Sequence, residues 1–166
     1  MRFPRLLSAL LALGLATCAS IPNHPEEVNC VTPSVNTLLW VRVSDSSGFS
    51  FLLPRGYREN TVMPVDSHVR GFEAEGWTLS LDFGKFSDDH RGAADPSDAH
   101  LECPAVIGGH SAVVVLTWPD RMAYNVGASW RDVRPGVSLW MGGAASTPEN
   151  QRALLTVLRS VEFTEH

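Results

Sequence analysis

Hydrophobic and polar residues alternate along much of the chain after residue 37, with the period of two that is typical of β-strands with one buried face. The clearest run covers residues 77–83, in which every second side chain is hydrophobic: Trp77, Leu79, Leu81 and Phe83. The dipeptide Glu75-Gly76 separates this run from residues 69–74, and this arrangement predicts a tight hairpin. The same alternation predicts further strands at residues 39–43, 49–53, 122–130 and 137–141.

Two segments depart from this alternation. Residues 112–118 are hydrophobic at nearly every position, which predicts a central strand covered on both faces. Thr147-Pro148 has the features of a helix start, with threonine as the N-cap and proline at the first helical position. The residues that follow carry a hydrophobic stripe at helical spacing: Leu154, Leu155, Leu158 and Val161. We therefore predict an α+β domain, an antiparallel β-sheet with a C-terminal helix packed on it.

The start of the chain has the features of a secretory signal. Arg2 and Arg5 make it basic, and residues 6–15 form a hydrophobic run that is too short to span a bilayer as a helix. The run ends on Leu15-Ala16-Thr17-Cys18, which resembles the lipobox of bacterial lipoproteins, although Thr17 is unusual at its position. This resemblance implies that Cys18 becomes the lipidated first residue of the mature chain.

The sequence divides into three parts. We expect a signal peptide over residues 1–17, a flexible polar tether over 18–29, and a single domain over 30–166, which is long enough for one hydrophobic core. Lipid at Cys18 would anchor the protein in the bacterial cell envelope, at the outer membrane or the periplasmic face. The alternative is cleavage near Ala19 or Ser20, which would give a secreted soluble protein.

Composition and cysteine content narrow the possible functions. The chain has 18 acidic residues against 13 Lys and Arg, and a net charge of −5 without a basic cluster argues against nucleic acid as a partner. If Cys18 carries lipid, Cys30 and Cys103 are the two remaining cysteines. An oxidising compartment favours a disulfide between them, and the alternative is two separate buried thiols.

The segment 87–102 is the candidate for cation binding, because it combines carboxylates with imidazoles. Its possible metal ligands are Asp88, Asp89, His90, Asp95, Asp98 and His100. Their spacing fits neither an EF-hand loop nor a zinc motif. We interpret the segment as a solvated acidic loop and keep a divalent-cation site as the alternative; no other cofactor is expected.

Catalytic motifs are absent from the sequence, so we expect a protein that is not an enzyme. His110-Ser111, beside Gly108-Gly109, has the residue types of a base and a nucleophile. Adjacent side chains on an extended segment point to opposite faces, however, and the sequence lacks the G-x-S-x-G motif. A hydrolase is therefore the least favoured alternative.

The five tryptophans are candidates for core or contact residues. Trp77 and Trp130 are in phase with their strands, which predicts burial in the core. Trp40 and Trp140 are out of phase, and either a second layer covers them or they are exposed as anchors for a partner. We favour burial under a second layer.

Short motifs along the domain resemble those of PsbP-like domains. Gly48-Phe49-Ser50-Phe51 followed by Leu53-Pro54-Arg55-Gly56-Tyr57 is similar to their opening motif, and residues 154–163 are similar to their closing helix and strand. Residues 107–112 resemble the turn that leads into a central strand, so the resemblance spans residues 37–163. The superfamily includes the photosystem subunit PsbP, Mog-type Ran-binding proteins and DcrB-type bacterial lipoproteins. Membership implies an assembly, scaffold or binding role without catalytic residues.

These features together predict a lipoprotein of the cell envelope with a non-enzymatic protein-binding or assembly role. Its expected partner is another envelope protein, contacted through a sheet edge or through the segment 87–102. Its expected contact with the membrane is the lipid at Cys18. The alternative function is binding of a small ligand or a divalent cation by the acidic segment.

Overall fold

The computed structural model describes residues 35–60, 66–87, 99–118 and 124–164. These residues form ten strands and one helix. In chain order the elements are β1 (Val41–Asp45), β2 (Phe49–Leu53), β3 (Arg58–Asn60), β4 (His68–Ala74), β5 (Trp77–Gly84), β6 (Ala99–Ile107), β7 (His110–Trp118), β8 (Tyr124–Arg134), β9 (Val137–Ala145), α1 (Pro148–Arg159) and β10 (Glu162–Phe163).

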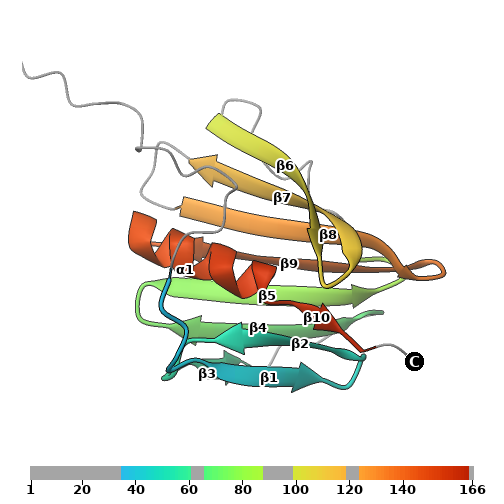
Figure 1. The fold of residues 1–166 in the computed structure, drawn as a ribbon, viewed down its shortest axis with the longest axis horizontal. Helices are drawn as coiled ribbons and strands as arrows, with labels where there is room; N and C mark the ends of the chain where they lie inside the picture. Colours follow the sequence, from blue (N-terminus) through green and yellow to red (C-terminus); the bar gives the residue numbers. More distant parts are fainter. Residues whose placement is uncertain (1–34, 61–65, 88–98, 119–123, 165–166) are drawn as a thin grey trace, which may run out of the picture.

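The strands form two antiparallel sheets (Figure 1). The large sheet has seven strands in the order β3-β4-β5-β9-β8-β7-β6, and the small sheet has the order β1-β2-β10. Hairpins connect most neighbours in the large sheet, and β9 returns to pair with β5 across a long stretch of sequence. The C-terminal strand β10 pairs with β2, so both ends of the described chain meet in the small sheet.

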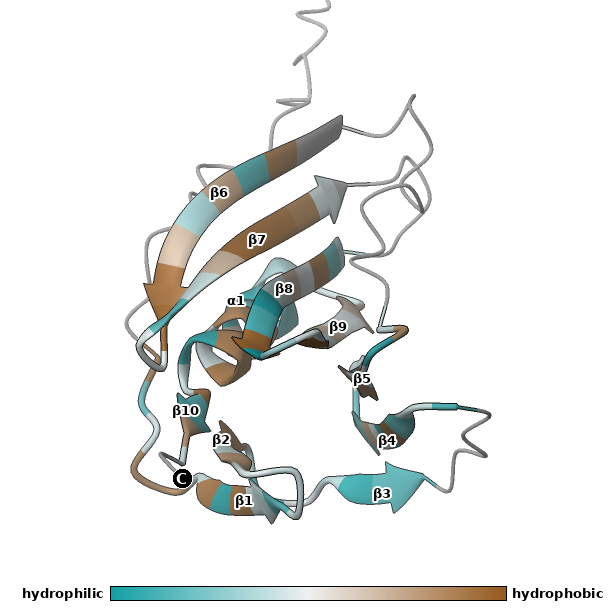
Figure 2. Ribbon diagram, turned by 90° about the vertical axis from the view of Figure 1, so that its right-hand side faces the viewer, coloured by the Kyte–Doolittle hydropathy of each residue, from teal (hydrophilic) through white to brown (hydrophobic). Residues whose placement is uncertain are grey.

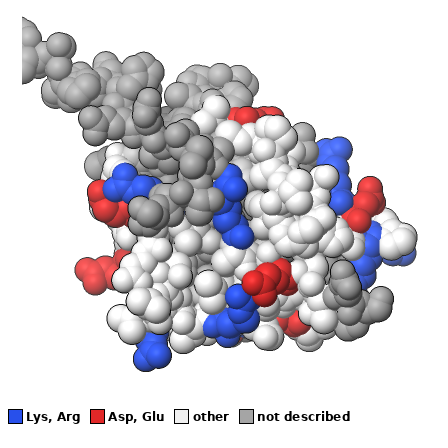
Figure 3. Space-filling view, viewed as in Figure 1, with Lys and Arg blue, Asp and Glu red and all other residues white. Residues whose placement is uncertain are grey.

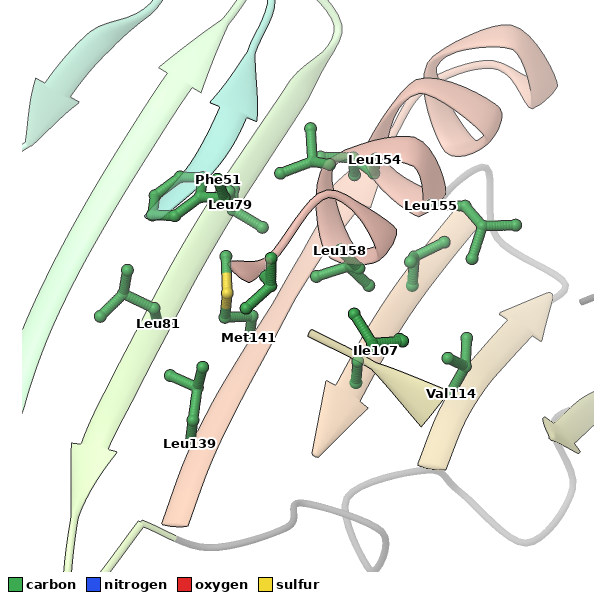
Figure 4. Close-up of a cluster of buried hydrophobic side chains, with 14 of the residues drawn as sticks. Phe51, Leu79, Leu81, Ile107, Val114, Leu139, Met141, Leu154, Leu155 and Leu158 are labelled. Carbon is green, nitrogen blue, oxygen red and sulfur yellow. The ribbon is translucent and has the colours of Figure 1, made fainter. Parts of the chain in front are cut away.

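The helix α1 and the small sheet lie on the same side of the large sheet. Figure 2 shows the large sheet bending around them, and α1 contacts β2, β5, β8 and β9. The core fills the space between these layers and includes Phe51, Leu81, Met141 and Leu158, all of them fully buried (Figure 4). The opposite face of the large sheet carries no helix or second sheet made of described residues.

Local sequence explains why the helix begins and ends where it does. The Thr147 side chain accepts a hydrogen bond from the Asn150 amide at 3.2 Å, and Pro148 occupies the first turn. Leu154, Leu155 and Leu158 are buried, with at most 1% exposure. The helix ends at Ser160, whose hydroxyl donates to the Val157 carbonyl at 2.6 Å and accepts from the Leu52 amide at 2.8 Å. The predicted C-terminal helix is therefore confirmed, and so is a mostly antiparallel sheet.

Two expectations about strands were wrong. Residues 112–118 lie in β7, which is next to the last strand of the sheet, and Val113 and Val115 are half-buried. The central strand is β9. The segment 87–102, interpreted as a loop, includes the start of β6 at Ala99. The continuous hydrophobic run did not predict the position of β7 in the sheet. Neighbouring side chains can partly cover both faces of such a strand even where no second layer of helices or strands packs on it.

Candidate functional site

The predicted cation site lies largely outside the described residues. Asp88, Asp89, His90, Asp95 and Asp98 belong to the stretch that the structure does not describe. His100 is placed by its backbone in β6, opposite Thr117. Among the described residues, no group of three or more His, Cys, Asp or Glu could hold a metal ion. The cation site remains a prediction from the sequence.

Two of the three cysteines also lie outside the described residues. Cys18 and Cys30 lie outside the described residues, and Cys103 is half-buried in β6, opposite Val114. The lipid at Cys18 and the Cys30–Cys103 disulfide therefore remain predictions. Within the described part of the chain, no helix is long and hydrophobic enough to cross a bilayer.

His110 and Ser111 do not form a catalytic pair. The His110 ring packs edge-on against Phe163 with a centroid distance of 4.6 Å, on the side of the small sheet. Ser111 lies on the opposite face and is exposed. The turn before them has a packing role, because a Cβ at Gly108 would lie 2.7 Å from the Val161 carbonyl oxygen.

Three of the tryptophans are buried or partly buried, as we expected from their positions along the strands, and Trp140 differs. Trp77 and Trp130 are buried, at 7% and 0% exposure, and Trp40 packs against the core from a partly buried position. Trp140 lies on the face of the large sheet that α1 does not cover, since it is in register with Asp82 and Ser129. Its indole lies over Gly142, where an added Cβ would collide with the ring. The expected cover by a second layer of secondary structure is not found for Trp140 in the described residues.

An ion-pair network centred on the buried Asp45 carboxylate joins the small sheet to the large one. Asp45 of β1 is fully buried and accepts hydrogen bonds from Arg70 of β4 at 2.9 Å and from the Ser47 amide at 2.8 Å. The Nε2 atom of His68 lies 3.0 Å from the same carboxylate. Arg70 also binds the Glu59 carboxylate through two nitrogens, at 2.7 and 2.9 Å.

These contacts change the pKa values of the charged groups. Burial acts to raise the pKa of Asp45, but the hydrogen bonds from Ser47, His68 and Arg70 outweigh it and lower the pKa. The hydrogen bonds from Arg70 lower the pKa of Glu59, and the Glu59 contact raises the pKa of Arg70. All of these shifts favour the charged forms, which fits a network that holds the two sheets together.

The strand β6 is the candidate contact surface for a protein. It is the last strand of the large sheet, and among the described strands it pairs with β7 alone. Leu101 and Val106 are exposed on it, at 37% and 74%. On the face that carries α1, acidic and basic side chains are interspersed (Figure 3), and exposed pairs such as Arg152–Glu149 contribute little to stability.

The sequence analysis did not identify the Asp45–Arg70 pair or the strand β6. Only the first of these is indicated by a pattern in the sequence. Asp45 and Arg70 occupy inward positions of their strands, in phase with Val43 and Phe72. Charged residues of opposite sign at hydrophobic positions of two strands could have indicated a buried pair. The strand β6 left little signal, because Glu102, Cys103 and Pro104 interrupt its hydrophobic positions.

Comparison with known proteins supports the fold. A scan against models of protein families found no match, and a search of curated proteins also found none. The solution structure of cyanobacterial PsbP (CyanoP) from Synechocystis sp. PCC 6803 superposes with a TM-score of 0.55 and 13% sequence identity. The match covers 79% of this chain and 96% of that one. The chain therefore carries a domain with the PsbP-like fold, as its short motifs indicated.

Proposed function

We propose that this protein, built on a PsbP-like domain, is a non-catalytic binding module of the bacterial cell envelope that engages another envelope protein. The observation that carries the proposal is the position of β6 at the end of the large sheet. An edge strand offers backbone N–H and C=O groups to a strand of a partner, and its side chains supply specificity.

The side chains of β6 support this role. Leu101 and Val106 are hydrophobic and exposed near opposite ends of the strand. Between them, Pro104 has no N–H group, so it limits how far a partner strand can pair along the edge. Such an arrangement favours a short, defined contact over open-ended association of sheets.

The proposed anchor would bring this edge close to the membrane. A lipid at Cys18 followed by the tether 18–29 would allow a separation of at most roughly 40 Å, given the reach of an extended chain. A disulfide from Cys30 to Cys103 would place the start of the domain beside β6. A partner in or on the same membrane would then lie within reach of the edge.

Photo-crosslinking in cells tests the proposal. A photoreactive amino acid replaces Leu101 on β6, and the matched control carries it at Glu149, whose side chain is 71% exposed on α1. We expect one envelope protein to be captured from position 101 and absent from position 149. Equal capture from both positions, or none from position 101, would contradict the proposal.

The anchor has its own test. Cells are labelled with an alkyne fatty acid, and the label on the wild-type protein is compared with that on Cys18→Ser. We expect the label to be lost in the variant and the protein to leave the membrane fraction. Retention of the label in the variant would show that the lipid is attached to another residue and would contradict the proposed anchor.

A further inference from the structure

The turn that leads into β1 carries two exposed leucines. Leu38 and Leu39 occupy its two central positions and are 87% and 72% exposed. The Trp40 amide donates a hydrogen bond of 2.9 Å to the Thr37 carbonyl, which closes the turn. Central turn positions usually hold glycine, proline, asparagine, aspartate or serine. The formation of the turn therefore does not explain why two adjacent leucines stand here.

The turn is held at both of its ends. The Leu38 amide donates to the Asn36 side chain at 3.0 Å, and Trp40 packs against the core. The two leucines are therefore presented outward on a fixed base. Because two N–H groups of the turn are already hydrogen-bonded, its tip can leave water at a smaller cost than an open loop, whose unbonded groups would be unsatisfied in a hydrophobic medium.

The pair of leucines is too small to form a stable protein interface by itself. Such an interface buries roughly 800 Å² on each partner, well beyond the area that two leucine side chains provide. The other large exposed hydrophobic residues of the described chain lie elsewhere, on β6 and directly after β5. A lipid bilayer needs no complementary surface of this size, because it accepts single protruding hydrophobic side chains.

The surroundings of the turn fit the polar part of a bilayer. Val41 pairs with Leu53, so the turn after β2 lies at the same end of the small sheet as the turn before β1. That second turn carries Arg55, which is exposed. A guanidinium binds phosphate groups well, and the headgroups of phospholipids supply them. The hydrophobic tip and a nearby cation thus match the two layers of a membrane surface.

The position of the turn in the chain also favours a membrane contact. Cys18, the proposed site of lipid attachment, precedes Leu38 by 20 residues. The segment between them leads directly into the turn, so a lipid at Cys18 would hold the turn near the bilayer. Tethering of this kind raises the effective concentration of a second, weaker contact.

We infer that the turn 37–40 rests on the bilayer, with Leu38 and Leu39 inserted among the lipids and Arg55 at the level of the phosphate groups. The inference rests on the anchor proposed above, because two leucines bury too little area to hold a protein on a membrane alone. It goes further by orienting the domain. The bilayer lies at the end where β1 begins, and the ends of β1 and β5 point away from it (Figure 1).

Photo-crosslinking in cells tests the inference on the full chain. A photoreactive amino acid replaces Leu38, and mass spectrometry identifies whether the captured molecule is a phospholipid or a protein. The matched control carries the same amino acid at Phe86, which is 71% exposed and follows the end of β5. We expect phospholipid to be captured from position 38 and to be absent from position 86.

Two variants at the neighbouring residue test whether insertion requires a hydrophobic tip. With the photoreactive group at position 38, Leu39→Asp places a charge beside it and should lower lipid capture to the level at position 86. Leu39→Val keeps the tip hydrophobic and should retain the capture. Neither variant should change the thermal midpoint, because Leu39 is exposed and packs against no core residue.

Three results would overturn the inference. They are the absence of phospholipid from position 38, capture of a protein or a second copy of this chain there in its place, and equal lipid capture from position 86.

The fatty-acid label on Cys18, measured in the same cells, separates this inference from the proposed anchor. The label without lipid capture from position 38 would support the anchor and overturn the membrane contact of the turn. Lipid capture without the label would support the contact and contradict the anchor. Crosslinking from Leu101 on β6 is a separate measurement, so the two failures are distinguishable from failure of the protein contact.

Discussion

Arg70 donates a hydrogen bond of 2.9 Å to the Asp45 carboxylate, and this pair joins the large sheet to the small one. The Asp45 side chain is fully buried, whereas Arg70 is 19% exposed and keeps contact with water. The Arg70 guanidinium also lies over the ring of Phe72, a core residue, at 5.0 Å from the ring centroid. The packing of the two sheets therefore includes a specific polar contact among hydrophobic ones.

Replacement of Asp45 should destabilise the domain. Asp45→Asn removes the buried negative charge that pairs with Arg70, and we expect a loss of about 2–3 kcal/mol in the free energy of unfolding. Glu59→Gln removes the exposed partner of Arg70 and should cost less than about 1 kcal/mol, because water screens that contact. Urea denaturation of both variants checks this order, and equal losses would contradict it.

The same network predicts how stability depends on pH. The pKa values of Asp45 and Glu59 are lower in the folded protein than in the unfolded chain, so the unfolded chain binds more protons between the two values. The stabilisation is complete above the unfolded value, about 3.9 for aspartate, and is lost as the pH falls through the folded value. Asp45→Asn should flatten the decline in stability below about pH 4. Parallel pH profiles for the variant and the wild type would contradict the assignment.

The indole of Trp140 should respond to the size of the residue beneath it. Gly142→Ala places a methyl group against the ring, and we expect the indole to move and the domain to lose about 1–3 kcal/mol. Gly127, directly opposite Gly142 on β8, supplies the control, because its added Cβ would lie at an ordinary 3.7 Å from Trp140 Nε1. Indole NMR signals and thermal unfolding should change in Gly142→Ala and hardly at all in Gly127→Ala. Similar spectra for the two variants would place the indole elsewhere.

The predicted disulfide should contribute strongly to stability. A bridge from Cys30 to Cys103 would close a long loop in the unfolded chain, and its loss in Cys30→Ser should cost about 4 kcal/mol. The same loss should follow reduction of the wild type by dithiothreitol. Mass spectrometry of peptides from the unreduced protein should recover the two cysteines linked to each other. Two free thiols in the protein isolated from the envelope would refute the pairing.

The sequence predicted an element well where its hydrophobic pattern and the turn or cap residues at its ends indicated the same structure. Glu75-Gly76 marks the hairpin between β4 and β5, and Gly76 has a φ of 78°, which glycine adopts more easily than other residues. Thr147 and Pro148 mark the start of α1. These signals are local, because a turn or a cap needs only a few neighbouring residues to form.

The candidate sites depended on contacts between distant residues. Asp45 and Arg70 meet across two sheets. The position of β6 at the sheet edge could not be predicted either, because strand order depends on which strands pair.

The sequence by itself therefore determined the antiparallel strands, the C-terminal helix and the PsbP-like motifs, because alternation, caps and turn residues act within a few positions of each other. Tertiary structure decided the rest. It placed α1 and the small sheet on one side of the large sheet and left Trp140 on the other. It also set β6 at the edge of that sheet. The physical reason is that burial and strand pairing are properties of the assembled layers, to which residues far apart in the chain contribute.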